Sequence, residues 1–190
     1  MKSGNLVIGQ SGGPTAVINA SLVGVVQEAR RHGEIGKVFG MRWGIQGFLQ
    51  EELVDLGSEP DDVLEAVRRT PSSALGSCRL KLKDEHLPLV LDVIRRHDIR
   101  FFFYIGGDDS QNTTHRVVEY CRTQGYELYG IGIPKTVDND LYGTDHTPGY
   151  GSAARYVALS AQQGGVLARD MQKVDPVCVY QAVEIGRAHV

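Results

Sequence analysis

The feature that most limits how this chain can fold is a run of apolar and aromatic residues, FFFYI, within residues 100–105. A strand that is apolar on both faces must be covered on both faces, which is typical of the interior of a parallel sheet. The run is followed directly by Gly106-Gly107-Asp108-Asp109-Ser110, and a helical pattern begins at Gln111. Strand, polar turn and helix in this order indicate one unit of a parallel α/β fold.

The same alternation recurs along the chain. Further strands are predicted at 5–9, 37–42, 127–133 and 177–182, and a shorter one at 51–56. Helices are predicted after Pro14, after Pro60, over 87–97 and over 149–168. In the last of these, Ala154, Ala158 and Ala161 share one side and are expected to pack closely on the sheet. The pattern predicts a doubly wound, mostly parallel sheet with helices on both faces.

Composition excludes several classes of protein. The net charge is −3, from 20 basic and 23 acidic residues without a long block of either sign, which argues against a nucleic-acid surface. Cys78, Cys121 and Cys178 fit neither a disulfide framework nor a C-x-x-C metal site, and the six histidines lack ligand spacing. With no signal peptide and no apolar run of membrane-spanning length, we expect a cytoplasmic protein that binds no membrane.

Three polar loops follow predicted strands, at residues 11–13, 106–110 and 135–140. Right-handed crossovers place every strand-to-helix loop at the same edge of a parallel sheet, so these loops should face one crevice. Plain alternatives exist: Ser-Gly-Gly is also an ordinary turn, and Asp, Asn and Pro in the third loop are favoured turn residues. In the separate loop at residues 70–79, an arginine such as Arg79 is often just solvated. The coincidence of the three loops favours a binding site.

Phosphoryl transfer suits such a crevice. Glycine backbones and Arg79 can hold phosphate oxygens. The Asp108 carboxylate can hold Mg²⁺ between phosphates, and the Asp138 carboxylate can take a proton from an attacking hydroxyl.

Four motifs together resemble those of the phosphofructokinase family: residues 11–13, 76–79, 106–110 and 134–140. The resemblance covers residues 5 to about 184. It implies Mg²⁺-dependent phosphoryl transfer to the 1-hydroxyl of fructose 6-phosphate, giving fructose 1,6-bisphosphate. It also implies a base, Asp138, supported by Thr136 and Asp140, and a metal ligand, Asp108. The donor-binding residues that it implies are Gly12, Gly13, Arg79, Gly107 and Ser110, and the sugar-binding residues are Thr136, Val137 and Asp138.

Two positions bear on the donor. By resemblance, Asp109 stands where ATP-dependent bacterial members usually carry glycine, and Asp109 with Lys135 is the pattern of the pyrophosphate-dependent branch. A carboxylate there should repel the α-phosphate of ATP, while Lys135 supplies a compensating cation. An ATP-dependent phosphofructokinase and a non-catalytic binding or regulatory paralogue are the alternatives. Intact Asp108, Asp138 and Asp140 argue against the paralogue.

The resemblance also predicts the organisation of the chain. Residues 1–184 are expected to form the donor-binding α/β domain of a longer enzyme that is a homo-oligomer at full length. Residues 185–190 read like a translated sequencing adapter and are predicted to be a non-native tail. Without a sugar-phosphate domain, the isolated chain is expected to be inactive.

Overall fold

The computed structural model describes residues 2–175 and 177–180. Its centre is a five-stranded sheet with the strand order β3-β2-β1-β4-β5. The neighbours β1–β2, β1–β4 and β4–β5 are parallel, and β3 pairs antiparallel with β2. The strands are β1 (Gly4–Gln10), β2 (Ile35–Met41), β3 (Leu53–Asp55), β4 (Ile99–Gly106) and β5 (Tyr129–Pro134). The apolar run lies in β4, between β1 and β5, so its predicted place inside the sheet is confirmed.

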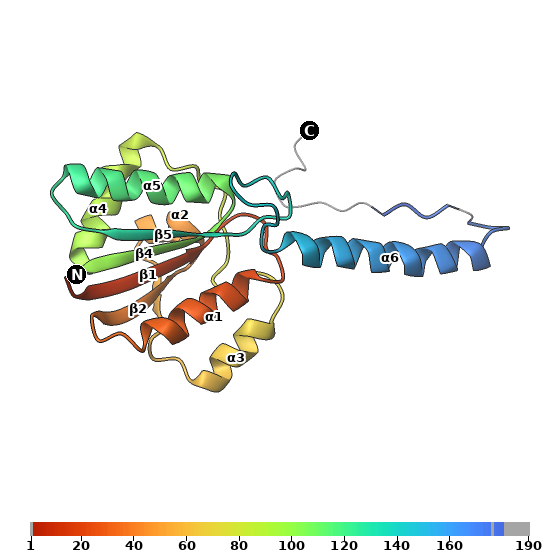
Figure 1. Cartoon of the computed structure of the whole chain (residues 1–190), viewed down its shortest axis with the longest axis horizontal. Helices are drawn as coiled ribbons and strands as arrows, with labels where there is room; N and C mark the ends of the chain where they lie inside the picture. The colour runs from red at the N-terminus through yellow and green to blue at the C-terminus, as the bar shows by residue number, and fades with distance from the viewer. Residues whose placement is uncertain (1, 176, 181–190) are drawn as a thin grey trace.

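Helices cover both faces of this sheet, which confirms the doubly wound fold (Figure 1). One face carries α1 (Ile18–Ala29) and α3 (Asp61–Arg69). The opposite face carries α2 (Gly44–Leu49), α4 (Leu87–Arg96) and α5 (Asp108–Thr123), and a short 3₁₀ turn, Asp84–His86, precedes α4. Side chains alternate across a strand, so successive β4 residues pack on opposite faces of the sheet. Phe101 and Ile105 belong to the core cluster under α1, whereas Phe102 and Tyr104 belong to the cluster under α4.

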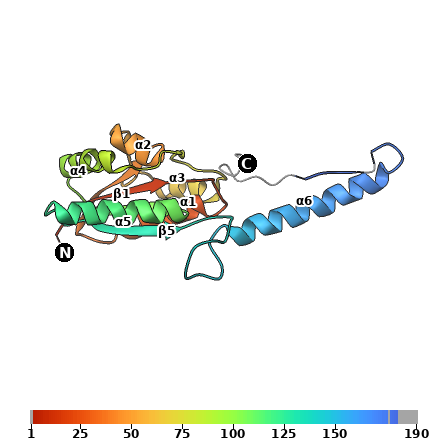
Figure 2. The ribbon, with the colours of Figure 1, turned by 90° about the horizontal axis from the view of Figure 1, so that it is seen from above.

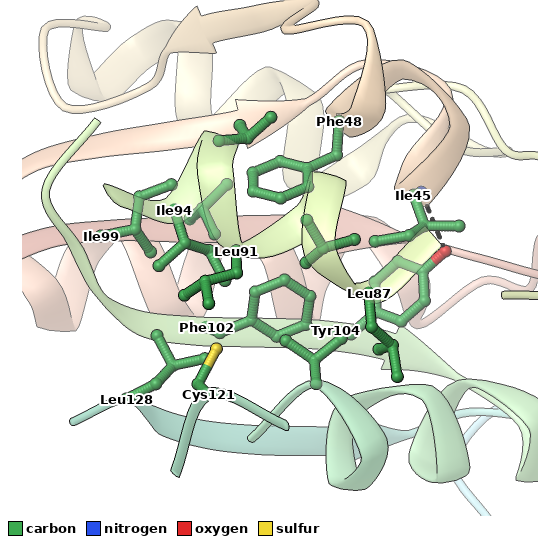
Figure 3. Close-up of a cluster of buried hydrophobic side chains, with 14 of the residues drawn as sticks. Ile45, Phe48, Leu87, Leu91, Ile94, Ile99, Phe102, Tyr104, Cys121 and Leu128 are labelled. Atoms are coloured by element: carbon green, nitrogen blue, oxygen red, sulfur yellow. Dashed lines mark hydrogen bonds between the residues drawn. The ribbon is translucent and has the colours of Figure 1, made fainter. Parts of the chain in front are cut away.

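The larger core cluster forms around the aromatic residues of β4 (Figure 3). Phe102 meets Phe48 of α2 edge to face, with ring centroids 6.0 Å apart. Burying each such ring stabilises the fold by about 1.5–3 kcal/mol. The Tyr104 hydroxyl accepts a hydrogen bond of 3.1 Å from the Ile45 backbone N–H. Burial raises the pKa of Tyr104, so this phenol remains neutral and joins α2 to the sheet.

The expected packing of the last helix on the sheet is wrong. Helix α6 (Tyr150–Asp170) extends away from the sheet (Figures 1 and 2), and Ala154, Ala158 and Ala161 are exposed. The reason lies in the contacts of the two residues that precede α6, Pro148 and Gly149. The Thr136 N–H donates to the Pro148 carbonyl at 3.3 Å, and Thr136 forms a β-bridge with Gly149. Because of this bridge, α6 begins at the carboxyl edge of the sheet and not above one of its faces. Its small side chains therefore do not reach the faces of the sheet.

Two further expectations concern the end of the chain. Residues 177–180 form no strand, and the rest of the predicted strand at 177–182 lies outside the described residues, as does the 185–190 tail. No helix within the described ranges combines the length and the hydropathy that crossing a membrane requires.

Candidate active site at the carboxyl edge of the sheet

The strand order creates a crevice between β1 and β4. From β1 the chain passes to β2 on one side, whereas β4 lies on the other side, so the loops that follow β1 and β4 diverge. Such a switch point is where open α/β sheets bind ligands. The two strand ends remain linked, because the Ser11 N–H donates to the Ile105 carbonyl at 2.9 Å.

A cavity of about 440 Å³ opens at this switch point, and all three predicted loops line it. The predicted convergence of the loops is therefore confirmed, and Asp108 and Asp138 lie around the same cavity rather than on opposite sides of the molecule. The lining residues that the sequence singled out are Gly12, Arg79, Gly107, Asp108, Asp109, Ser110, Lys135, Thr136, Asp138 and Asp140. Gly13 and Val137 are not among the lining residues.

Lys135 is the residue that joins the first and third loops. Its side chain is only 2% exposed, and its Nζ donates a 2.6 Å hydrogen bond to the Gly13 carbonyl. Gly12 has a φ of +73°, and a Cβ atom at Gly12 would lie 3.1 Å from the Lys135 Nζ. The glycine therefore serves both the left-handed turn and the close approach of the lysine.

The first loop differs from expectation in one respect. A helix is predicted directly after Pro14, but α1 begins only at Ile18, whose N–H donates to the Thr15 carbonyl. Residues 11–17 thus form a longer connection. The start of α1 is consequently separated in sequence from the glycines that line the cavity.

The second loop is tighter than predicted. Helix α5 begins at Asp108 and not at Gln111, with Gly107 as its N-cap and no side-chain cap. Gly106 has no room for a side chain, because a Cβ atom there would lie 2.1 Å from the Ser110 Oγ. Because α5 begins at Asp108, the carboxylates of Asp108 and Asp109 stand in the first helical turn, where the helix dipole favours negative charge. The backbone N–H groups of such a turn are typical phosphate ligands.

Asp109 pairs with a lysine that the sequence did not single out. The Lys81 Nζ lies 3.4 Å from the Asp109 Oδ2, and both side chains are largely exposed at the cavity. Lys135, which is expected to supply a compensating cation, lines the same cavity and donates to the Gly13 carbonyl. No motif contains Lys81, so sequence spacing carried no signal for the pair.

The third loop is shaped by Asn139. Its φ is +54°, its side-chain amide donates to the Asp145 carbonyl at 3.1 Å, and its Oδ1 accepts from the Thr147 N–H at 2.8 Å. The buried Thr136 accepts a 3.1 Å hydrogen bond from the Asp138 N–H. These contacts fix the turn and leave the Asp138 and Asp140 side chains lining the cavity.

The donor set suits a metal that is shared with a substrate. Among the residues described, no group of three or more His, Cys, Asp or Glu side chains could enclose a metal ion. Mg²⁺ rarely requires such a cage, since one or two carboxylates and the phosphates of the substrate commonly hold it. Asp108, which lines the cavity at the start of α5, fits that manner of binding.

Comparisons with known proteins agree with this geometry. The model of the family described as "Phosphofructokinase" matches residues 5–172. A pyrophosphate–fructose 6-phosphate 1-phosphotransferase of Halomonas elongata is 47% identical over 172 residues, which cover 87% of this chain and 41% of the relative. An ATP-dependent 6-phosphofructokinase of Staphylococcus aureus is 34% identical over 147 residues, covering 75% of this chain and 42% of that protein.

The solved structures give the same result. The structure of pyrophosphate-dependent phosphofructokinase from Marinobacter aquaeolei superposes with a TM-score of 0.84 at 47% identity, covering 92% of this chain and 43% of that one. The chain thus spans less than half the length of these proteins. The match to the family model extends from β1 to the residues just beyond α6, and the chain therefore belongs to the phosphofructokinase family.

Proposed function

We propose that residues 1–184 form the donor-binding domain of an enzyme that transfers a phosphoryl group from pyrophosphate to the 1-hydroxyl of fructose 6-phosphate. One observation carries the proposal: Asp108, Asp109 and Asp138, from two different loops, line one cavity together with Arg79 and Gly12. Greater similarity to the pyrophosphate-dependent relative, 47% against 34% for the ATP-dependent one, supports the choice of donor. We place the enzyme in the cytoplasm as a homo-oligomer.

Asp109 accounts for the choice of donor. Its carboxylate stands at the start of α5 and is largely exposed at the cavity, with Lys81 as its ion-pair partner. A nucleoside triphosphate would bring an additional phosphate toward that carboxylate, and the two negative charges would repel each other. Pyrophosphate, with two phosphates, has no such additional group.

The remaining residues fit an in-line transfer. Arg79 and the backbone of Gly12 and Gly107 would hold the donor oxygens, and Asp108 would hold Mg²⁺, which neutralises charge on the phosphates. Asp138 would accept the proton of the sugar 1-hydroxyl as the hydroxyl oxygen bonds to the phosphorus that is transferred. The bond between that phosphorus and the bridging oxygen of pyrophosphate breaks, and orthophosphate leaves. Thr136 and Asp140, at the same loop, would position the acceptor and the transferring group.

The test uses the full reading frame of the gene, because the isolated chain is expected to be inactive. Purified protein should form fructose 1,6-bisphosphate with pyrophosphate and Mg²⁺ and show little turnover with ATP. Asp109→Gly should raise the ratio of ATP to pyrophosphate kcat/KM by about tenfold or more, which corresponds to about 1.4 kcal/mol. Asp92→Asn, an exposed carboxylate on α4, is the control and should leave the ratio unchanged. Use of ATP but not pyrophosphate by the wild-type protein would establish the ATP-dependent alternative. Turnover with neither donor would favour the binding paralogue.

A further inference from the structure

Two buried side-chain amides lie behind the cavity. Gln10 ends β1, Asn19 is in the first turn of α1, and both are 0% exposed. The Gln10 Nε2 donates to the Asn19 Oδ1 at 2.9 Å and to the Ile18 carbonyl at 3.2 Å. Buried amides are costly unless their hydrogen bonds are satisfied, so such a pair needs further partners.

Those partners all come from one loop, residues 70–77. The Gln10 Oε1 accepts from the Ser73 Oγ at 2.8 Å and from the Leu75 N–H at 2.9 Å. The Asn19 Oδ1 accepts from the Ala74 N–H at 2.9 Å, and the Asn19 Nδ2 donates to the Thr70 carbonyl at 2.9 Å. No helix or strand includes residues 70–83. The two amides thus replace the backbone ladder that would otherwise fix this loop.

The loop ends at the cavity. The Ser77 Oγ donates to the Gly12 carbonyl at 2.7 Å, and the following residues, Cys78 and Arg79, line the cavity. Arg79 is exposed there and makes no ion pair with any other described residue. Within the described part of the chain, neither a helix nor an ion pair holds Arg79 in place, so its position depends on the path of the loop that precedes it.

We propose that Gln10 and Asn19 are positioning residues for Arg79: they hold residues 70–77 so that the guanidinium stands at the donor phosphates. The inference rests on the proposed function, since it takes Arg79 as a donor ligand. The chemistry requires amides at both places. A carboxylate could not donate to the Thr70 or Ile18 carbonyl, and an alkyl side chain would leave the N–H groups of Ala74 and Leu75 unpaired.

A double-mutant cycle tests the inference. Calorimetry measures binding of magnesium pyrophosphate to the protein carrying Asn19→Ala, Arg79→Met or both. Asn19→Ala should weaken binding about tenfold alone but less than about twofold in the Arg79→Met background, because residues that act through one another are not additive. Hydrogen exchange within 70–79 should rise in Asn19→Ala.

Asn5 provides the matched control. It too is an asparagine that links neighbouring segments, since its Nδ2 donates to the His97 carbonyl at 2.7 Å and its Oδ1 accepts from the Lys37 N–H at 2.8 Å. However, it lies at the opposite end of β1. Asn5→Ala should therefore lower thermal stability while leaving pyrophosphate affinity unchanged. If Asn19→Ala does not fold, Ser73→Ala takes its place, with an expected loss of about threefold that disappears with Arg79→Met.

The outcomes separate the two proposals. Additive losses from Asn19→Ala and Arg79→Met, or unchanged affinity despite faster exchange in the loop, would overturn the positioning role and leave the proposed function standing. Absence of pyrophosphate binding by the wild-type protein would instead refute the proposed function, and the positioning role would fall with it.

Discussion

Gly12 is the residue at which a single methyl group should test the cavity most directly. Its φ of +73° lies in the left-handed region, and a Cβ atom there would approach the Lys135 Nζ to 3.1 Å. For an L-residue the left-handed conformation costs about 1–2 kcal/mol. Gly12→Ala adds to this cost a displacement of the lysine that donates to the Gly13 carbonyl, so we expect a loss of stability greater than the backbone cost alone.

Two other glycines separate these contributions. Gly125 has a φ of +68° with open space around its Cβ position, so Gly125→Ala reports backbone strain alone. Gly24 lies inside α1, also with open space, and Gly24→Ala should stabilise the helix by about 0.5–1 kcal/mol. For a chain of this size 1 kcal/mol shifts Tm by about 2–4 °C. Calorimetric Tm should therefore fall by about 2–8 °C in Gly125→Ala, fall further in Gly12→Ala, and rise by about 1–4 °C in Gly24→Ala.

Binding completes the experiment. Displacing the Lys135 Nζ moves its positive charge relative to the cavity, so Gly12→Ala should weaken binding of magnesium pyrophosphate, whereas Gly125→Ala and Gly24→Ala should not. The reasoning fails if Gly12→Ala is no less stable than Gly125→Ala and binds pyrophosphate as the wild-type protein does. In that case the lysine yields without consequence, and the close approach has no role.

Two further predictions concern the base and the core. Asp138→Asn in the full-length enzyme should lower kcat by about 10²–10⁴ with little change in the affinity for pyrophosphate, because a general base acts only in the transition state; an unchanged kcat in steady-state assays would exclude Asp138 as the base. Burial raises the pKa of the Cys121 thiol from 9.0 to about 11. The unfolded chain therefore loses this proton first, and the free energy of unfolding should fall as pH rises from about 9 to 11. In urea titrations Cys121→Ala should flatten that fall; a slope equal to that of the wild-type protein would show that other groups cause it.

The sheet and the meeting of its loops could be predicted because they follow from local patterns and one rule of chirality. The apolar run in β4 requires cover on both faces, and the crossovers are right-handed, so the glycines after β1 and the carboxylates after β4 and β5 reach the same edge. Neither step needs the identity of any contact between side chains.

The partners of individual side chains could not be predicted in this way. Lys135 was expected at the cavity, but lysine is almost never fully buried, so no sequence pattern indicated that the Gly13 carbonyl would hold its side chain inside. Lys81 meets Asp109 only through the path of a loop without regular structure. Gln10 and Asn19 belong to no motif, and their role emerges only once residues 70–77 are folded against them.

The cavity loops are also bonded directly to one another. The Lys135 N–H donates to the Gly106 carbonyl at 3.0 Å and its Nζ donates to Gly13, while Ser77 donates to Gly12. Loops that follow β1, α3, β4 and β5 thus share one hydrogen-bonded frame. Groups held in this way lose little freedom when a ligand binds, which is the condition under which backbone N–H groups and fixed charges stabilise a transferring phosphoryl group most effectively. Each of these turns is common in sequence when taken alone, and the hydrogen bonds between them, together with the edge of the sheet, bring their residues to one cavity.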